Sequence, residues 1–457
     1  MINPLDENTR TALVRLLLPD LREAIARHPE EIGEIFEEIH PADGADLLSL
    51  LDDEEVRILL QHLDPAESAR LLEYVEPATA ARWLEEQRDE HVADIVEEME
   101  PDDRVELLAE FEEEEQEKVL AEMQPEERED VEELLSHEEG TAGRLMNPQF
   151  VTVPAHGTAE DALARARAGA REDWNIAMLY VVDEKGTLRG RVPLVEVLKA
   201  EADASIDSLS QEAEAVRVDT DQESVAQVIS KYDLVAVPVV DLHGRIVGIV
   251  TVDDVVDILT EEATEDAQRQ GAMQPLENSY FQTGFWEMVQ KRGVWLLVLF
   301  LAELFTASAL EHFDHVLKHA LTLVFFIPLI VSSGGNSGSQ SASLITRALA
   351  VGEVGVRDVL RIAGREIGMG VALGLALGIV GYLRVLIAGD SPLVCATVAL
   401  TLVGVVAIGA MVGAMLPLLF KRIGLDPAIT SSPFVASIVD VTGIVLYLSI
   451  ARLIMGI

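Results

Sequence analysis

The sequence predicts a multidomain protein with an N-terminal α-helical superhelix, a tandem α/β pair, a connecting helix and a five-helix transmembrane domain. Three observations support this division. The acidic charge of the 457-residue chain is confined to its first two-thirds, proline-initiated helical patterns repeat near the start, and long apolar runs fill the last third. The expected boundaries are residues 1–135, 136–260, 261–290 and 291–457, in that order.

The net charge of −46 belongs to the part of the chain before the apolar runs. Residues 291–457 carry 11 Lys and Arg against 9 Asp and Glu, so residues 1–290 hold the remaining 23 basic and 71 acidic side chains, a net charge of −48. Such a surface repels nucleic acid and anionic lipid headgroups and accumulates cations. A solvated acidic surface suited to a salty cytoplasm and a cation sensor are both compatible with this charge.

Residues 1–135 contain an internal helical repeat. Each copy opens with proline, continues with acidic residues and then places Leu or Val at helical spacing. The opening prolines lie 24, 12, 24 and 24 residues apart: Pro41, Pro65, Pro77, Pro101 and Pro125. Proline suits the first helical position, and carboxylates in the first turn complement the helix dipole. Short helices that bury one another's apolar faces in this way predict a superhelical scaffold without catalytic features.

Residues 136–260 alternate strand-like and helical segments. The order is strand, helix, strand, strand, helix, and it then repeats. The copy that begins with FVTVP at 150–154 matches the copy that begins with AVRVD at 215–219 over about 50 residues. The sequence therefore predicts a duplicated α/β module.

The short motifs of this region resemble a pair of CBS domains. They are LMNPQFVTVP, VVDEKGTLRG and GIVTVDDV. The resemblance implies an adenine nucleotide such as ATP between the modules. The second module keeps the hydroxyl and the acid of the family's nucleotide motif, at Thr251 and Asp254. The first module has Pro193 and Glu196 at the equivalent positions, a departure that weakens the expectation of ATP binding.

Five apolar segments predict five membrane spans. The run GVWLLVLFLAELFTASAL at 293–310 is long enough to cross the roughly 30 Å hydrocarbon core. Further spans are expected at 320–346, 366–388, 393–420 and 428–455. Most Lys and Arg residues between the spans fall on one side, so the positive-inside rule places the N-terminus in the cytoplasm and the C-terminus outside.

The second span contains the unusually polar run PLIVSSGGNSGSQSASLITRAL at 328–349. A polar backbone facing lipid is not tolerated at membrane depth. Either the helix is interrupted beside a water-filled path, or its small residues pack closely against other helices. We favour the path, with Gly335, Asn336 and Gln340 as candidates that line it.

The last span places the acid Asp440 14 residues after Asp426, near the cytoplasmic start of the span. A charge at the bilayer centre costs at least roughly 2.5–3.5 kcal/mol. No Lys or Arg is expected at a matching depth, so Asp440 should face water, a cation or a proton. A protonated carboxyl bonded to a nearby Ser or Thr is the simpler alternative. Pro433 opens this helix, and carbonyls around Ala436 are expected along the same path, whereas Glu303 of the first span should face the interior.

The membrane motifs resemble the MgtE family of magnesium channels and transporters. The motifs are GGNSGSQSASLITRALA, GAMLPLL and LDPAITSSPFVASIVDVTGIVLYLSIARL, with VTVDDVVDILTEEATED before the membrane. The order of the regions agrees over the whole chain. The resemblance implies a homodimer with the pore between subunits, Asp440 as the pore aspartate and Mg²⁺ as the transported cation. It also implies a bacterial cytoplasmic membrane, cytoplasmic N-terminal domains and a pore that cytoplasmic Mg²⁺ closes.

Regulatory Mg²⁺ ligands are expected among the acids that lead toward the membrane. Acids three or four residues apart share a helix face: Asp254 and Asp257 form one set, and Glu262, Glu265 and Asp266 form the other. The resemblance adds three acids of the second CBS module, Asp221, Glu223 and Asp233. We hypothesise that these faces repel one another at low internal Mg²⁺ and are drawn together at high Mg²⁺. A plain solvated acidic helix is the alternative.

Two other functions are compatible with the sequence. A secondary carrier that couples a cation to a proton through Asp440 is the main alternative. A CBS-based nucleotide sensor that governs another membrane protein is the third. An enzyme is not expected, because the sequence has no nucleophile–base pair, phosphate-binding loop or zinc-ligand spacing.

Overall fold

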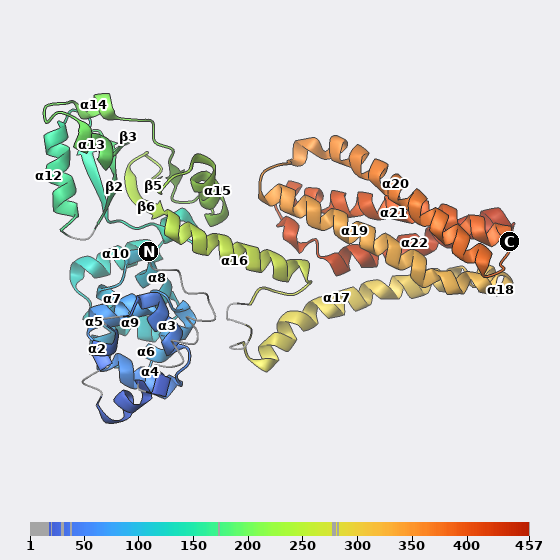
Figure 1. Ribbon diagram of the computed structural model, residues 1–457, viewed down its shortest axis with the longest axis horizontal. Coiled ribbons are helices and arrows are strands. Elements are labelled where there is room, and N and C mark those ends of the chain that lie inside the picture. The colour runs from blue at the N-terminus through green and yellow to red at the C-terminus, as the bar shows by residue number, and fades with distance from the viewer. Residues whose placement is uncertain are drawn as a thin grey trace, which may run out of the picture. The chain divides into compact units, whose positions relative to one another are not determined.

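The computed structural model divides near residue 260 into two compact units, Met1–Leu259 and Thr260–Ile457 (Figure 1). It describes residues 18–19, 21–28, 32–36, 39–171, 174–276, 280 and 283–456. The first 17 residues of the expected acidic domain therefore lie outside the described residues.

Short helices form the first part of the first unit. They are α2 (Ile32–Phe36), α3 (Pro41–Leu48), α4 (Asp53–Leu60), α5 (Pro65–Leu72), α6 (Pro77–Leu84), α7 (Asp89–Glu97), α8 (Pro101–Ala109), α9 (Glu113–Glu122) and α10 (Pro125–Leu135). Each of the five repeat prolines begins a helix, as the sequence predicted. From α3 to α10 each helix packs against the next but one, which buries a continuous Leu- and Val-rich core and confirms the superhelix. The 24-residue spacing covers two helices, because α4, α7 and α9 begin with acids instead of proline.

The duplicated α/β module is also confirmed. After α11 (Ala142–Leu145), the first copy contains β1 (Phe150–Pro154), α12 (Ala159–Gly169), β2 (Asn175–Val182), β3 (Leu188–Pro193), α13 (Leu194–Lys199) and α14 (Ile206–Leu209). The second contains β4 (Val216–Arg217), α15 (Gln222–Tyr232), β5 (Ala236–Val240), β6 (Ile246–Thr251) and α16 (Val252–Gln270). In each copy the first two strands are parallel and the last two antiparallel, so both sheets have the same order.

The expected connecting helix over 261–290 is not one helix. Its first part is the end of α16, which begins directly after β6, and its last part is the start of α17 (Phe285–His312). The described residues between them are not helical. Gly271 follows the end of α16 and Pro275 lies shortly beyond, and both residues disfavour continuation of a helix.

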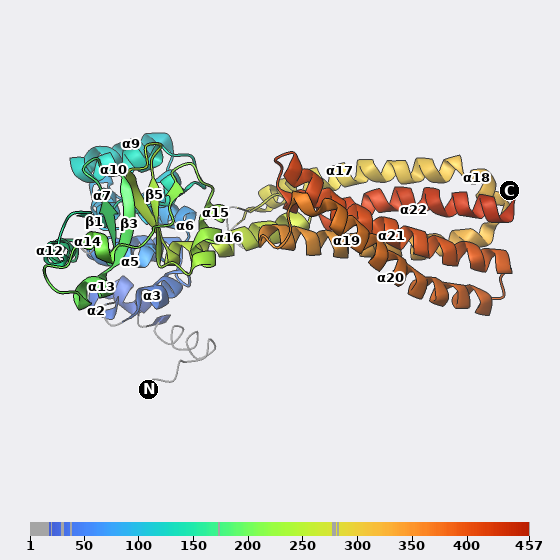
Figure 2. The ribbon, with the colours of Figure 1, turned by 90° about the horizontal axis from the view of Figure 1, so that it is seen from above.

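Among the described residues of the second unit, five helices are long and apolar enough to cross a membrane, which agrees with the five predicted spans (Figure 2). The unit contains α17, α18 (Asp314–His319), η2 (Leu321–Phe326), α19 (Ile327–Ala350), η3 (Val356–Asp358), α20 (Val359–Ile387), α21 (Pro392–Arg422), η4 (Pro427–Ile429) and α22 (Ser432–Met455). Helix α19 runs without a break through the glycine-rich motif, so the helix interruption suggested by the sequence is absent. Its glycines provide close packing instead.

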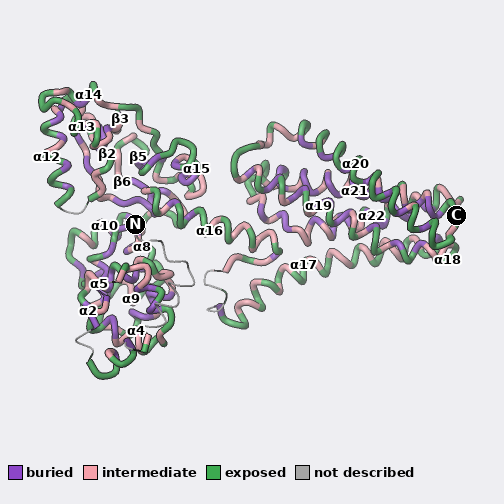
Figure 3. Tube along the Cα trace, viewed as in Figure 1, coloured by how far each residue is buried: buried purple, intermediate pink, exposed green. Residues whose placement is uncertain are grey.

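Helix α21 packs against α19, α20 and α22 at very short backbone separations. A Cβ atom added at Gly413 of α21 would lie 2.0 Å from the carbonyl oxygen of Gly338 on α19, and one at Gly409 would lie 2.4 Å from that of Gly334. Buried positions accordingly line α19 and α21, whereas the described residues of α17 include none that is fully buried (Figure 3). Small residues at helix interfaces are the usual means of close association in membranes.

We expect Gly413→Ala to destabilise the membrane unit, because the added methyl group meets backbone that cannot move aside without separating α19 from α21. Overpacking of this kind costs about 1–3 kcal/mol of unfolding free energy. Thermal unfolding of the detergent-solubilised protein measures the effect. The matched control is Gly364→Ala on α20, where the added Cβ has no neighbour within 4 Å. Equal unfolding temperatures for the two variants would contradict the packing argument.

Candidate functional site

Asp440 lies on α22, about two turns after the helix begins. The start of the helix is fixed locally, because the side chain of Ser431 accepts a hydrogen bond from the backbone N–H of Phe434 and Pro433 follows in the first turn. The side chain of Asp440 is half-buried within a span. Asp440 thus lies within one of the helices that are long and apolar enough to cross a membrane, and its role in a pathway stays a prediction.

The glycine-rich face of α19 lies opposite this carboxylate. A Cβ atom at Gly335 would lie 3.5 Å from Cβ of Ala436 and 3.9 Å from Oδ1 of Asp440. The hydroxyl of Ser339 donates to the carbonyl oxygen of Ser432 at 3.3 Å and joins α19 to the start of α22. Three of the predicted pore residues, Gly335, Ala436 and Asp440, are therefore brought together by the contact of two helices.

The other predicted pore residues of α19 occupy a different face. Asn336 and Gln340 are exposed in this chain, as is Ser332, and the three lie four residues apart. The side-chain amide of Asn336 donates to Oγ of Ser332 at 3.5 Å. Residues four apart share a helix face, so this polar stripe of Ser332, Asn336 and Gln340 runs along a membrane-spanning helix without cover from its own chain.

Two glutamates of the spans have partners that the sequence did not identify. Glu303 on α17 is half-buried, and its carboxyl group lies within hydrogen-bonding range of that of Asp440. Glu366 on α20 is 6% exposed and accepts a 2.6 Å hydrogen bond from Ser341 of the glycine-rich motif. The carboxyl group of Glu366 is thus buried against α19. The only signal in the sequence was the presence of acids within apolar segments.

In the first unit, acids of the superhelix meet acids at the start of α16. Burial raises the pKa of Asp102 well above its usual range, and the neighbouring charge of Asp254 raises it further. Burial also raises the pKa of Asp103 to about 8, and Glu73 contributes to this increase. Asp102 is 8% exposed, and its Oδ1 atom has no hydrogen-bond partner. We call Glu100, Asp102, Asp103 and Asp254 the acidic interface.

Asp254 is held by the residue that precedes its helix. Its Oδ2 atom accepts from the backbone N–H of Thr251 at 3.0 Å and from the Thr251 hydroxyl at 2.7 Å. Burial raises the pKa of Asp254 despite these hydrogen bonds. Thr251 and Asp254, the expected nucleotide-motif pair, are thus adjacent, and ATP binding stays a prediction. Asp257, one turn further along α16, also has a pKa raised by burial.

The three acids expected on the second CBS module lie at the ends of α15. The side chain of Asp221 caps the N-terminus by accepting from the backbone N–H of Ser224 at 2.9 Å, and Glu223 lies in the first turn. Asp233 ends the helix in the left-handed conformation, with φ of 50°. These positions do not bring Asp221 and Asp233 together within this chain. In the described part of the chain, no group of three or more His, Cys, Asp or Glu is arranged to hold a metal ion.

The second set of acids on α16 lies beside a basic side chain. Arg269 forms ion pairs with Glu265, four residues earlier, and with Asp426, which precedes η4 and α22. Burial raises the pKa of Asp266 on the same stretch. Glu262, on the preceding turn, completes the set. Arg269 therefore joins the end of α16 to the segment that leads into the helix of Asp440.

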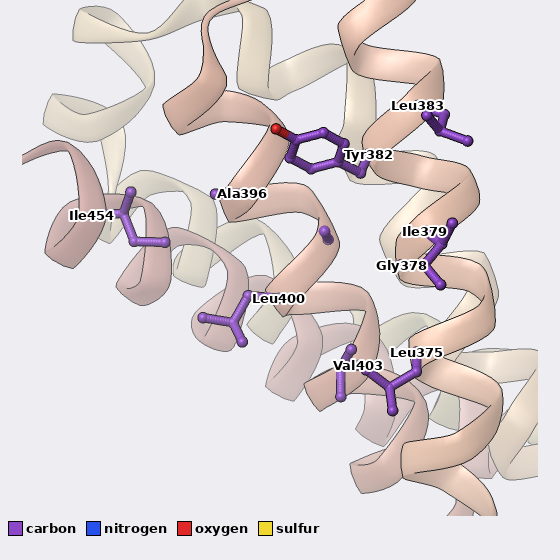
Figure 4. Close-up of a pocket in the computed structure, with 10 residues that line it drawn as sticks. Leu375, Gly378, Ile379, Tyr382, Leu383, Ala396, Leu400, Val403 and Ile454 are labelled. Atoms are coloured by element: carbon purple, nitrogen blue, oxygen red, sulfur yellow. The ribbon is translucent and has the colours of Figure 1, made fainter.

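An apolar crevice of about 510 Å³ lies on α20 and α21, away from these acids. Leu375, Ile379 and Tyr382 of α20 face Ala396 and Leu400 of α21 across it (Figure 4). Its lining is apolar, and it contains none of the predicted site residues. A surface of this kind on two spans suits lipid chains and not a cation.

Comparison with known proteins agrees with this architecture. A family profile described as "Divalent cation transporter" matches residues 327–450, one described as "MgtE intracellular N domain" matches 39–140, and CBS domains match 142–203 and 206–261. The soluble part of a magnesium transporter superposes with a TM-score of 0.51 and 31% identity, covering 55% of this chain and 99% of that one. The cytosolic domain of the Mg²⁺ channel MgtE in complex with ATP gives the same TM-score and 35% identity, covering 53% and 100%.

Two magnesium transporters match a longer part of the chain than these structures do. Magnesium transporter MgtE of Thermus thermophilus is 42% identical over 326 residues, which cover 71% of this chain and 72% of that protein. Magnesium transporter MgtE of Bacillus subtilis is 30% identical over 325 residues, which cover 70% and 71%. With the superhelix, the CBS pair and the five apolar helices in the order expected from the sequence, the chain belongs to the MgtE family of magnesium transporters.

Proposed function

We propose that this protein carries Mg²⁺ into a bacterial cell across the cytoplasmic membrane, through a pathway that passes the carboxylate of Asp440. The observation that supports this most strongly is the position of Asp440 against the small-residue face of α19 at Gly335. A carboxylate at membrane depth requires water, a cation or a proton. Mg²⁺ dehydrates reluctantly and keeps several waters, so a single carboxylate with nearby carbonyls suits it better than a tight cage.

The pathway is proposed to form between two copies of the chain. The polar stripe of Ser332, Asn336 and Gln340 is uncovered in one chain, and amides facing lipid are costly. A second copy, together with water between the subunits, would satisfy these groups. Two Asp440 side chains would then contribute up to two negative charges to one pathway, which favours divalent over monovalent cations. The cytoplasmic side of the protein is proposed to be the acidic first unit, in line with the positive-inside rule.

Cytoplasmic Mg²⁺ is proposed to close this pathway. The acidic interface packs carboxyl groups together without a basic partner for Asp102, and such an arrangement is favourable only when protons or cations reduce the repulsion. Mg²⁺ would supply that charge and bring the superhelix against the start of α16. At the other end of α16, Arg269 already links Glu265 to Asp426. Closing would thus be transmitted along one helix that carries both sets of acids.

We expect Asp440→Asn to abolish Mg²⁺ uptake while the protein remains folded, because the amide keeps the shape of the side chain and removes its charge. Growth of a magnesium-transport-deficient bacterium in low Mg²⁺, together with Mg²⁺ influx into proteoliposomes, measures this. Asp390→Asn, a loss of one acid in the short connection between α20 and α21, is the control and should retain uptake. Equal rescue by Asp440→Asn and wild type would remove Asp440 from the pathway.

The same proteoliposomes distinguish a channel from the proton-coupled carrier. A channel gives a steady Mg²⁺ current that is proportional to the driving force and leaves internal pH unchanged. A carrier that exchanges protons through Asp440 gives a Mg²⁺-dependent pH change, and that result would replace the channel with the alternative.

Arg269→Ala is expected to make closure require several-fold more cytoplasmic Mg²⁺. Without the guanidinium, Glu265 and Asp426 lose the positive charge that they share, so Mg²⁺ must supply more of it. The measurement is Mg²⁺ current from excised patches over a range of cytoplasmic Mg²⁺. Arg422→Ala removes an exposed arginine near Asp426 and should not change the inhibition curve. An unchanged curve for Arg269→Ala would exclude this ion pair from gating.

The acidic interface should make the first unit less stable as pH rises. Asp103 has its pKa raised from 3.8 to about 8, so between these values the folded state binds a proton that the unfolded chain has released. Stability is therefore greatest near pH 4 and falls toward pH 8, by at most about 1.4 kcal/mol per pH unit for one group. Thermal unfolding of fragment 39–276 in a chelator tests this. Asp103→Asn should flatten the profile, and a stability that rises with pH would contradict it.

A further inference from the structure

Glu303 is the only charged residue in the apolar run 293–310 of α17. The described residues of α17 include no fully buried one, so a polar side chain on this helix is not held by general packing. Glu303 is nevertheless half-buried, and α17 packs against α22, where the carboxyl group of Glu303 interacts with that of Asp440. Contact between the two helices thus brings a second acid to the proposed pathway.

The surroundings of this pair are short of positive charge. Within the described residues, no Lys, Arg or His forms an ion pair with Glu303 or Asp440. The Oγ1 atom of Thr306, one turn from Glu303 on the same face of α17, is buried without a hydrogen-bond partner. By contrast, the hydroxyl of Ser308 on this helix donates to the carbonyl oxygen of Leu304 at 3.1 Å. The carboxyl groups of Glu303 on α17 and Asp440 on α22 therefore lie together without a partner of opposite charge.

We propose that Glu303 is a second cation-contacting residue of the transport pathway, which acts with Asp440 on a hydrated divalent cation. This inference rests on the proposed function of Asp440 and deepens it, because it places the charge of the pathway on two helices of each chain. Oxygen ligands and retained water are the coordination that Mg²⁺ prefers. Two carboxylates in contact gain more from a divalent than from a monovalent cation, since a monovalent cation balances only one of them. Glu303 would thus contribute to the selection of ion charge.

The test compares single variants of the full-length protein in liposomes, with Mg²⁺ as the only divalent cation. Glu303→Gln keeps the size of the side chain and removes its charge. We expect it to raise the Mg²⁺ concentration for half-maximal influx roughly tenfold and to lower the Mg²⁺ over Na⁺ preference by a similar factor. The matched control is Glu311→Gln, an exposed acid two turns further along α17, which should leave both quantities unchanged.

Asp440→Asn, measured alongside, separates this inference from the proposed function. If Asp440→Asn is inactive while Glu303→Gln matches wild type in both quantities, the inference is overturned and the Asp440 pathway remains. If Asp440→Asn transports normally, the pathway itself is wrong. Should Glu303→Gln fail to fold, Glu303→Asp decides the question. A shortened carboxylate alters the Mg²⁺ dependence if Glu303 contacts the cation, and leaves it unchanged if Glu303 is only structural.

Discussion

The membrane unit is organised around the cost of placing the carboxylate of Asp440 in hydrocarbon. That cost, at least roughly 2.5–3.5 kcal/mol for a charge at the bilayer centre, is reduced only where the side chain finds water or a cation. Gly335 provides the room, since any larger residue would project toward Asp440. Gly335 is in place because Gly334 and Gly338 let α19 approach α21, where Gly409 and Gly413 allow near-contact of the backbones. The small residues that suggested an interrupted helix therefore provide the close helix packing that positions Gly335 beside Asp440.

The first unit has the same shortage of positive charge in a milder form. Two like charges 4 Å apart repel by about 4 kcal/mol at an effective dielectric constant of 20. Burial raises the pKa of Asp102 and the charge of Asp254 raises it further, whereas hydrogen bonds from Thr251 partly offset the effect of burial on the pKa of Asp254. A unit with this interface changes its stability with the cations around it. Both units thus share one property, carboxyl groups that lie together without a basic side chain to balance them.

Local features were predictable from the sequence, whereas contacts between distant segments were not. Proline at helix starts, the duplicated strand order and five apolar spans follow from neighbouring residues, and all three were confirmed. Arg269 and Asp426 lie 157 residues apart, and nothing in either segment indicates the other. The pairing of Asp102 with the start of α16 was equally hidden, because dozens of acids in the superhelix have the same local pattern. The continuity of α19 was misjudged since packing against α21 outweighs the low helix propensity of glycine.

Two contacts of the second unit both lead along the chain to Asp440: the ion pair of Arg269 with Asp426 and the pair of Glu303 with Asp440 itself. Arg269, at the end of α16, pairs with Asp426, and Asp426 leads through η4 into α22 with Asp440. After α16 the chain continues into α17, and Glu303 of this helix interacts with the same carboxylate. A displacement of the end of α16 therefore acts on Asp440 through the start of its own helix and through the helix of its neighbouring acid. Because the described residues of α17 include none that is fully buried, little side-chain packing holds this helix against α22, and the carboxyl pair is one polar contact between the two helices.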